Sequence, residues 1–136
     1  MRVLSVDPGR WVVLALALML AVGGLTACSA EVQPSIGNCS PSYTPTSKYG
    51  RFSAQQRGPG APIQWGIYPN MAATRFVVDV YVGSHRVDRK DQNYPPHGSV
   101  SAADVRGRAR QIFRISGTAW DSDQNTLAFT LQCYVA

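Results

Sequence analysis

The side chains best suited to acid–base chemistry lie close together in one segment, residues 85–97. It contains both histidines of the chain, His85 and His97, and the carboxylates Asp88 and Asp91. A carboxyl acts as a general acid when burial or a like charge raises its pKa. Here the basic residues at positions 86, 89 and 90 would instead keep both carboxylates ionised and exposed. The chain also has no Gly-x-Ser-x-Gly or His-Glu-x-x-His pattern, so we expect no enzyme, no catalytic residue and no cofactor.

Two stretches of the sequence contain residue types that can bind metal ions. Asp121, Asp123 and Asn125 alternate as they do at the start of a calcium loop. Thr126 then stands where such a loop needs glycine, and Gln132 where it needs glutamate. Asp, Ser and Asn also build turns, so this stretch predicts a hairpin turn. The histidines and carboxylates of segment 85–97 could bind zinc, but lone surface histidines are usually solvated, and we expect no metal.

A basic cluster follows at Arg106, Arg108, Arg110 and Arg114. Arginines at alternate positions 106, 108 and 110 would share one face of an extended strand. One interpretation is the solvated face of an edge strand, where charge discourages aggregation. The other is an electropositive stripe that binds acidic lipid, polysaccharide or a protein. These three arginines are therefore candidate binding residues.

The stretch from Asp91 to Ser99 has no period-two alternation. Its centre, Tyr94-Pro95-Pro96, favours a polyproline conformation and prevents strand pairing. One interpretation is an exposed binding loop, with Asp91, Tyr94 and His97 as candidate binding residues. The other is a long crossover between two sheets, stiffened by proline.

The N-terminus has the form of an export signal. Arg2 and Arg10 precede or flank an apolar run from Trp11 to Leu25. The run is shorter than the roughly 20 residues that span a bilayer comfortably, and has the size of a signal-peptide core.

This run ends in Leu25-Thr26-Ala27-Cys28, which resembles the lipobox of bacterial membrane lipoprotein precursors. The resemblance covers residues 1–28 only. It implies that residues 1–27 are a signal peptide, that Cys28 carries diacylglycerol, and that the protein is exported and anchored on the outer face of the bacterial cell membrane. Two acyl chains make a stable anchor. An uncleaved N-terminal anchor and a plain signal peptide are the alternatives.

Two cysteines, Cys39 and Cys133, remain after Cys28. An even pair in an oxidising compartment predicts a disulfide, with free thiols or a metal pair as alternatives. The chain-entropy model gives about 4–5 kcal/mol for a loop of this length. The chain is basic, with a formal net charge of +5. A basic surface suits an anionic envelope, and we expect no nucleic acid in this compartment.

The remaining residues predict an all-β domain. Period-two alternation indicates strands over 63–68, 76–82, 85–90, 112–120 and 126–135, and a weaker one over 48–54. Gly83-Ser84 predicts a two-residue hairpin, and 101–105 could make one helical turn. We therefore expect a small antiparallel β-sandwich of immunoglobulin-like size, stapled by one disulfide, after an N-terminal signal helix.

Three segments are expected: the signal peptide 1–27, a lipidated Ser/Pro/Gly-rich tether and N-terminal segment 28–62, and the main sandwich body 63–136. Within the second, Ser29–Asn38 is expected to be a free tether. The leading functional hypothesis is non-catalytic binding at the cell envelope, to a protein or a polysaccharide. The alternatives are a prophage-type lipoprotein that blocks superinfection, and a small envelope enzyme or hydrolase inhibitor.

Overall fold

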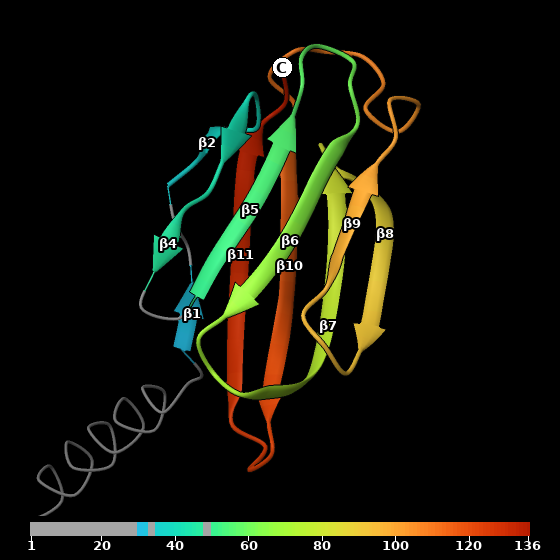
Figure 1. Ribbon diagram of the computed structural model, residues 1–136. Coiled ribbons are helices and arrows are strands. Elements are labelled where there is room, and N and C mark those ends of the chain that lie inside the picture. The colour runs from blue at the N-terminus through green and yellow to red at the C-terminus, as the bar shows by residue number, and fades with distance from the viewer. Residues whose placement is uncertain (1–29, 33–34, 48–49) are drawn as a thin grey trace, which may run out of the picture.

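The computed structural model describes residues 30–32, 35–47 and 50–136, so the signal helix and Cys28 lie outside the described residues. Two sheets pack face to face as the layers of a sandwich (Figure 1). Sheet A has the strand order β1-β11-β10-β7-β8, and β2 also pairs with β11. Sheet B has the order β3-β5-β6-β9, and β4 also pairs with β5. The described residues contain no helix, and the predicted all-β sandwich is confirmed.

Sheet A contains β1 (Ala30–Val32), β2 (Gly37–Asn38), β7 (Ala73–Val82), β8 (His85–Gln92), β10 (Ile112–Asp121) and β11 (Thr126–Tyr134). Sheet B contains β3 (Ser42–Tyr43), β4 (Thr46–Ser47), β5 (Gly50–Gln56), β6 (Ile63–Pro69) and β9 (His97–Val100). Residues 28–62, which were expected to precede the main sandwich body, therefore contribute β3, β4 and β5 to sheet B.

Alternate side chains of the long strands form the core, as their sequence pattern predicts. Phe76, Val78 and Val80 of β7 have no exposed surface, whereas the residues between them are only partly buried. Phe52 of β5 and Phe113 of β10 are also buried, and their ring centroids lie 6.5 Å apart. This contact joins sheet B to sheet A through the middle of the sandwich.

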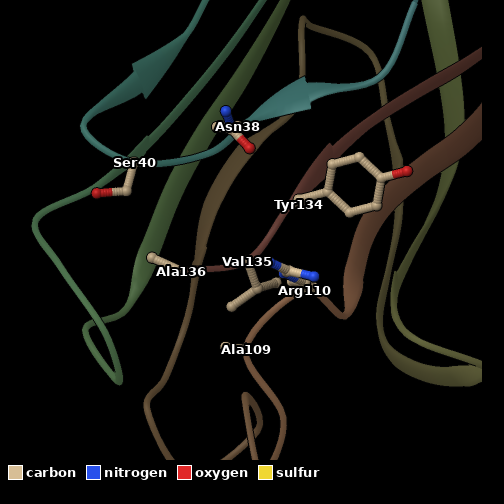
Figure 2. A pocket seen from close by; sticks show the side chains of 7 residues that line it. All are labelled: Asn38, Ser40, Ala109, Arg110, Tyr134, Val135 and Ala136. Carbon is tan, nitrogen blue, oxygen red and sulfur yellow. The ribbon is translucent and has the colours of Figure 1, made fainter.

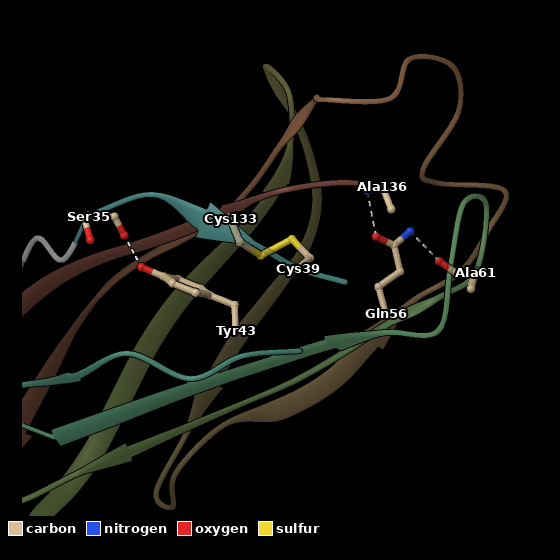
Figure 3. Close-up of a disulfide and its surroundings, with 7 residues drawn as sticks. All are labelled: Ser35, Cys39, Tyr43, Gln56, Ala61, Cys133 and Ala136. Atoms are coloured by element: carbon tan, nitrogen blue, oxygen red, sulfur yellow. Dashed lines mark hydrogen bonds between the residues drawn. A yellow bond between two sulfur atoms is a disulfide. The ribbon is translucent and has the colours of Figure 1, made fainter. Parts of the chain in front are cut away.

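The predicted disulfide between Cys39 and Cys133 is present, across a sequence separation of 94 residues (Figure 3). Cys133 lies on β11, in sheet A. Cys39 follows β2 of sheet A and precedes β3 of sheet B. The disulfide therefore fixes the chain at the point where it passes from one sheet to the other.

Both predicted tight turns are confirmed. Gly83 and Ser84 join β7 to β8, and Gly83 has a φ of 60°, which a glycine adopts without steric cost. Residues 122–125 join β10 to β11. The return strand β8 is longer than predicted and reaches Gln92, because Asp91 and Gln92 still pair with Val77 and Phe76.

The prediction of a long irregular stretch from Asp91 to Ser99 is therefore wrong at both ends. Only residues 93–96 lie outside strands, and His97–Val100 forms β9 against β6. The prolines end before β9 begins, so they remove no hydrogen bond from its ladder. The segment passes from β8 in sheet A to β9 in sheet B, which confirms the crossover interpretation of its path.

The prediction that arginines 106, 108 and 110 lie on an extended strand is also wrong. Residues 101–111 form a loop between β9 and β10. Gly107 has a φ of 111° and Arg110 a φ of 77°, and both values are incompatible with a strand. The suggested helical turn is present, because Ser101 O accepts hydrogen bonds from the N–H groups of Asp104 and Val105.

The expected free tether over Ser29–Asn38 is not free where the structure describes it. β1 pairs with Leu127–Phe129 of β11, and β2 pairs with Cys133–Tyr134 of the same strand, both in parallel. The edge of β11 offers unpaired backbone groups that a polar segment can satisfy without burying apolar side chains. Composition alone therefore misjudged this segment.

Candidate functional site

The three candidate arginines lie in an exposed loop at one end of the sandwich. We call residues Arg106–Arg110 the arginine loop. Its start is fixed by the turn at Ser101, whose hydroxyl bonds the Asp104 carboxylate at 2.6 Å, and by Val105, which is 8% exposed. Arg106, Arg108 and Arg110 are all exposed. The loop is thus held at its base, where Arg106 Nε also donates a hydrogen bond to Ala103 O at 3.1 Å, while the arginine side chains remain exposed.

The end of the arginine loop is tied to the last residues of the chain. Arg110 N–H donates to Val135 O at 2.9 Å, and Val135 N–H donates to Gln111 O at 2.8 Å. Gln56, which is fully buried, accepts a hydrogen bond from Ala136 N–H at 2.9 Å (Figure 3). Arg110 keeps its left-handed φ because these bonds fix the backbone on its C-terminal side.

A shallow cavity of about 660 Å³ lies beside Arg110 (Figure 2). It is lined by Asn38, Ser40, Ala109, Arg110, Tyr134, Val135 and Ala136. Its size is within the range of small-molecule sites. Tyr134 is 39% exposed and lines the same cavity as Arg110.

The disulfide holds two walls of this cavity together. Asn38 and Ser40 flank Cys39, while Tyr134 follows Cys133. Cys39 N–H also donates to Tyr134 O at 2.9 Å. The disulfide and the pairing of β2 with β11 therefore hold Asn38 and Ser40 beside Tyr134.

Sequence reasoning identified Arg110 but missed Asn38, Ser40 and Tyr134. One signal could have found them, because a Cys39–Cys133 disulfide makes the neighbours of the two cysteines spatial neighbours. No local sequence pattern indicates that Arg110 lies near these residues, because its position depends on backbone hydrogen bonds to Val135.

The arginine loop differs electrostatically from the other charged surface, on sheet A. There Arg86 and Arg89 both bond the Asp79 carboxylate, at 3.3 and 3.1 Å. Arg75 bonds the two carboxylate oxygens of Asp91, at 3.1 and 3.0 Å. Among the described residues, by contrast, no carboxylate forms an ion pair with any arginine of the arginine loop.

The other candidate residues, Asp91, Tyr94 and His97, lie on β8, in the crossover and on β9. The hydrogen bond from Arg75 holds the pKa of the Asp91 carboxyl below its usual value, so Asp91 is ionised and already paired. Tyr94 is 58% exposed, and its carbonyl accepts a hydrogen bond from Gln92. His97 is exposed on β9 opposite Gly66. This set lies at the far end of β9 from the arginine loop (Figure 1).

The Asp121 turn uses its carboxylate internally. Asp121 accepts hydrogen bonds from the N–H groups of Asp123 and Asn125 and from the Asn125 side chain, all at 2.8 to 2.9 Å. The Asn125 side-chain bond is the main cause that lowers the pKa of the Asp121 carboxyl. Within the described residues, no three His, Cys, Asp or Glu side chains gather where they could hold a metal ion.

Comparisons with protein-family models, curated proteins and solved structures found no match to this chain. The described residues include no helix that is long and apolar enough to cross a bilayer.

Proposed function

We propose that the chain is an exported, lipid-anchored protein of the bacterial cell envelope that binds an anionic polysaccharide without catalysis. The lipobox-like Leu25-Thr26-Ala27-Cys28 supports the anchor at Cys28. The Cys39–Cys133 disulfide supports export, since such bonds persist in oxidising compartments.

The observation that carries the binding role is the unpaired positive charge of the arginine loop. Arg75, Arg86 and Arg89 of sheet A form ion pairs with Asp79 or Asp91. Among the described residues, Arg106, Arg108 and Arg110 form none. A guanidinium presents a planar fork of donors that matches a carboxylate or a phosphate. The loop can therefore bind the acidic groups of a polymer without any change in the fold.

Two features favour a polysaccharide over a folded protein. The three arginines lie along a short, irregular loop, which suits a linear chain of charges better than a flat partner surface. Tyr134, which lines the same cavity as Arg110, offers an apolar ring on which a sugar ring can pack. A preformed cavity and exposed charges at one place are typical of a binding site.

Affinity for polygalacturonate, measured with neutral dextran as the control, tests this proposal. Replacing Arg106, Arg108 and Arg110 together by glutamine should weaken binding about 100-fold, if each charged contact is worth about 1 kcal/mol. The matched control replaces the paired arginines of sheet A, at positions 75, 86 and 89, by glutamine, and so removes the same net charge. Equal losses in the two variants would show that net charge alone governs binding. Tighter binding to polyglutamate than to polygalacturonate would instead indicate an acidic protein partner.

A further inference from the structure

One row of paired residues crosses the whole of sheet A. Ala30 of β1 lies opposite Leu127, which lies opposite Ala119. Ala119 in turn lies opposite Phe76, and Phe76 lies opposite Gln92. The first residue of β1 is therefore level with the beginning of β11, at the end of the sandwich that carries the 122–125 turn (Figure 1).

An anchor at Cys28 would be close to this row. Two residues of extended chain span at most about 7 Å, so Cys28 can be no farther than that from Ala30. The neighbouring position in the register is Trp120 opposite Thr126, one residue beyond the row toward the turn. An acyl chain on Cys28 would thus bring the Trp120 end of the domain to the bilayer.

The arginine loop lies at the opposite end. Tyr134 follows Leu127 by seven positions along β11, which corresponds to about 24 Å. Arg110 is bonded to Val135, just beyond that strand. The Debye length is only about 8 Å at physiological ionic strength, so headgroup charge near Ala30 would be screened before it reaches the loop.

In the described part of the N-terminal segment, β1 is the strand that pairs at the same end as the row. β2, the next described strand, pairs with Cys133 and Tyr134, and the disulfide follows at Cys39. If β1 left β11, the first described residue still held to the domain would be Ser35, whose carbonyl accepts a hydrogen bond from the Tyr43 hydroxyl (Figure 3). The chain from Cys28 to Ser35 could then span about 25 Å, and either end of the domain could meet the membrane.

We infer that the pairing of β1 with β11 sets the orientation of the anchored domain: the Trp120 end contacts the membrane, and the arginine loop is held away from it. This inference rests on the proposed attachment at Cys28. It also narrows the proposed function, because the loop would meet anionic polymer outside the anchoring bilayer and not the acidic headgroups of that bilayer.

Quenching of tryptophan fluorescence by a lipid with a nitroxide on its headgroup measures this orientation. The full chain, with Trp11→Phe, is produced in a bacterial host, purified from membranes and placed in vesicles of phosphatidylglycerol and phosphatidylcholine. The fluorescence of Trp120 reports on the end of the domain that carries the 122–125 turn. A Trp120→Phe/Ala102→Trp variant reports on the other, since Ala102 is exposed in the loop before the arginines. Trp120→Phe alone measures the contribution of the buried Trp65.

We expect quenching of Trp120 and none above background for the Ala102→Trp variant. Replacing Ala30–Val32 by three prolines removes every backbone donor of β1, so quenching should fall at Trp120 and rise in the Ala102→Trp variant. Three threonines at the same positions keep those donors and should keep the original pattern. Melting curves show whether the proline variant is folded. If it is not, the two indole positions in the unaltered β1 background still decide the orientation.

The intact mass of the purified protein distinguishes failure of the lipid anchor from failure of the inferred orientation. A membrane-bound protein with diacylglycerol on Cys28 but equal or reversed quenching at the two positions would overturn the inferred orientation and leave the anchor standing. A protein without diacylglycerol that stays out of the membrane fraction would overturn both. An unmodified chain retained by its N-terminal segment, with Trp120 quenched, would support the orientation and contradict the lipid.

Discussion

Replacing Gln56 by leucine should destabilise the domain by about 2–3 kcal/mol, because the side chain forms two hydrogen bonds at a fully buried position. Its oxygen accepts from Ala136 N–H at 2.9 Å, and its nitrogen donates to Ala61 O at 3.1 Å (Figure 3). Gln56 thereby joins the 57–62 loop to the residues that support Arg110. Leucine has a similar volume, so the change removes polar contacts without opening a large cavity.

The magnitude follows from the two backbone groups that the leucine would leave without a partner. An unsatisfied buried donor or acceptor costs about 1–3 kcal/mol. Ala61 and Ala136 are each partly exposed, so water can reach both groups and the cost should lie near the lower limit for each. For a domain of this size, the total corresponds to a fall in melting temperature of roughly 10–20 °C.

Urea unfolding with the disulfide intact measures this difference. The adjacent Gln55 is the matched control, because it lies on the same strand but is exposed. Gln55→Leu should change the free energy of unfolding by no more than about 0.5 kcal/mol. If Gln56→Leu also stays within that limit, with an unchanged m-value, the two hydrogen bonds do not stabilise this end of the sandwich and the reasoning fails.

Two further predictions concern the rest of the fold. Gly117→Ala should destabilise the domain by about 1–3 kcal/mol in urea unfolding, because the added Cβ would lie 2.3 Å from the Val77 backbone oxygen. Gly58→Ala is the control, because nothing lies within 4 Å of its added Cβ, and it should be nearly neutral in the same measurement. Asp121→Ala should lower the melting temperature at pH 7 and much less at pH 2. Hydrogen bonds hold the pKa of the Asp121 carboxyl below its usual value, so its contribution is complete above the unfolded pKa of about 3.9 and is lost as the pH falls through the folded pKa. An equal difference at both pH values would contradict this assignment.

The strands that the sequence predicted well are those whose own residues determine them. Alternation of apolar residues over Phe76–Val82 and Leu127–Val135 follows directly from the two-residue period of a strand with one buried face. Gly83-Ser84 determines its hairpin through local backbone freedom. The disulfide was predictable because only one pair of cysteines remained after Cys28.

The short strands β1 and β2 could not be predicted in this way. Each has only two or three residues, and each exists because β11 offers a free edge. Their partner is about one hundred residues away along the chain, so no local pattern indicates the pairing. The proposed orientation of the domain depends on this contact, although the segment has the composition of a tether.

The arginine loop shows why charge spacing is weaker than hydrophobic spacing as a guide to structure. Alternate apolar residues must share a face because burial stabilises only one arrangement, whereas alternate exposed arginines gain little from sharing one. Gly107 and Arg110 could therefore adopt left-handed backbone angles at no loss of burial. A glycine would fit the φ of 77° at position 110 better than an arginine does. The backbone hydrogen bonds that join Arg110 and Gln111 to Val135 therefore hold position 110 at a φ that its own residue type does not favour.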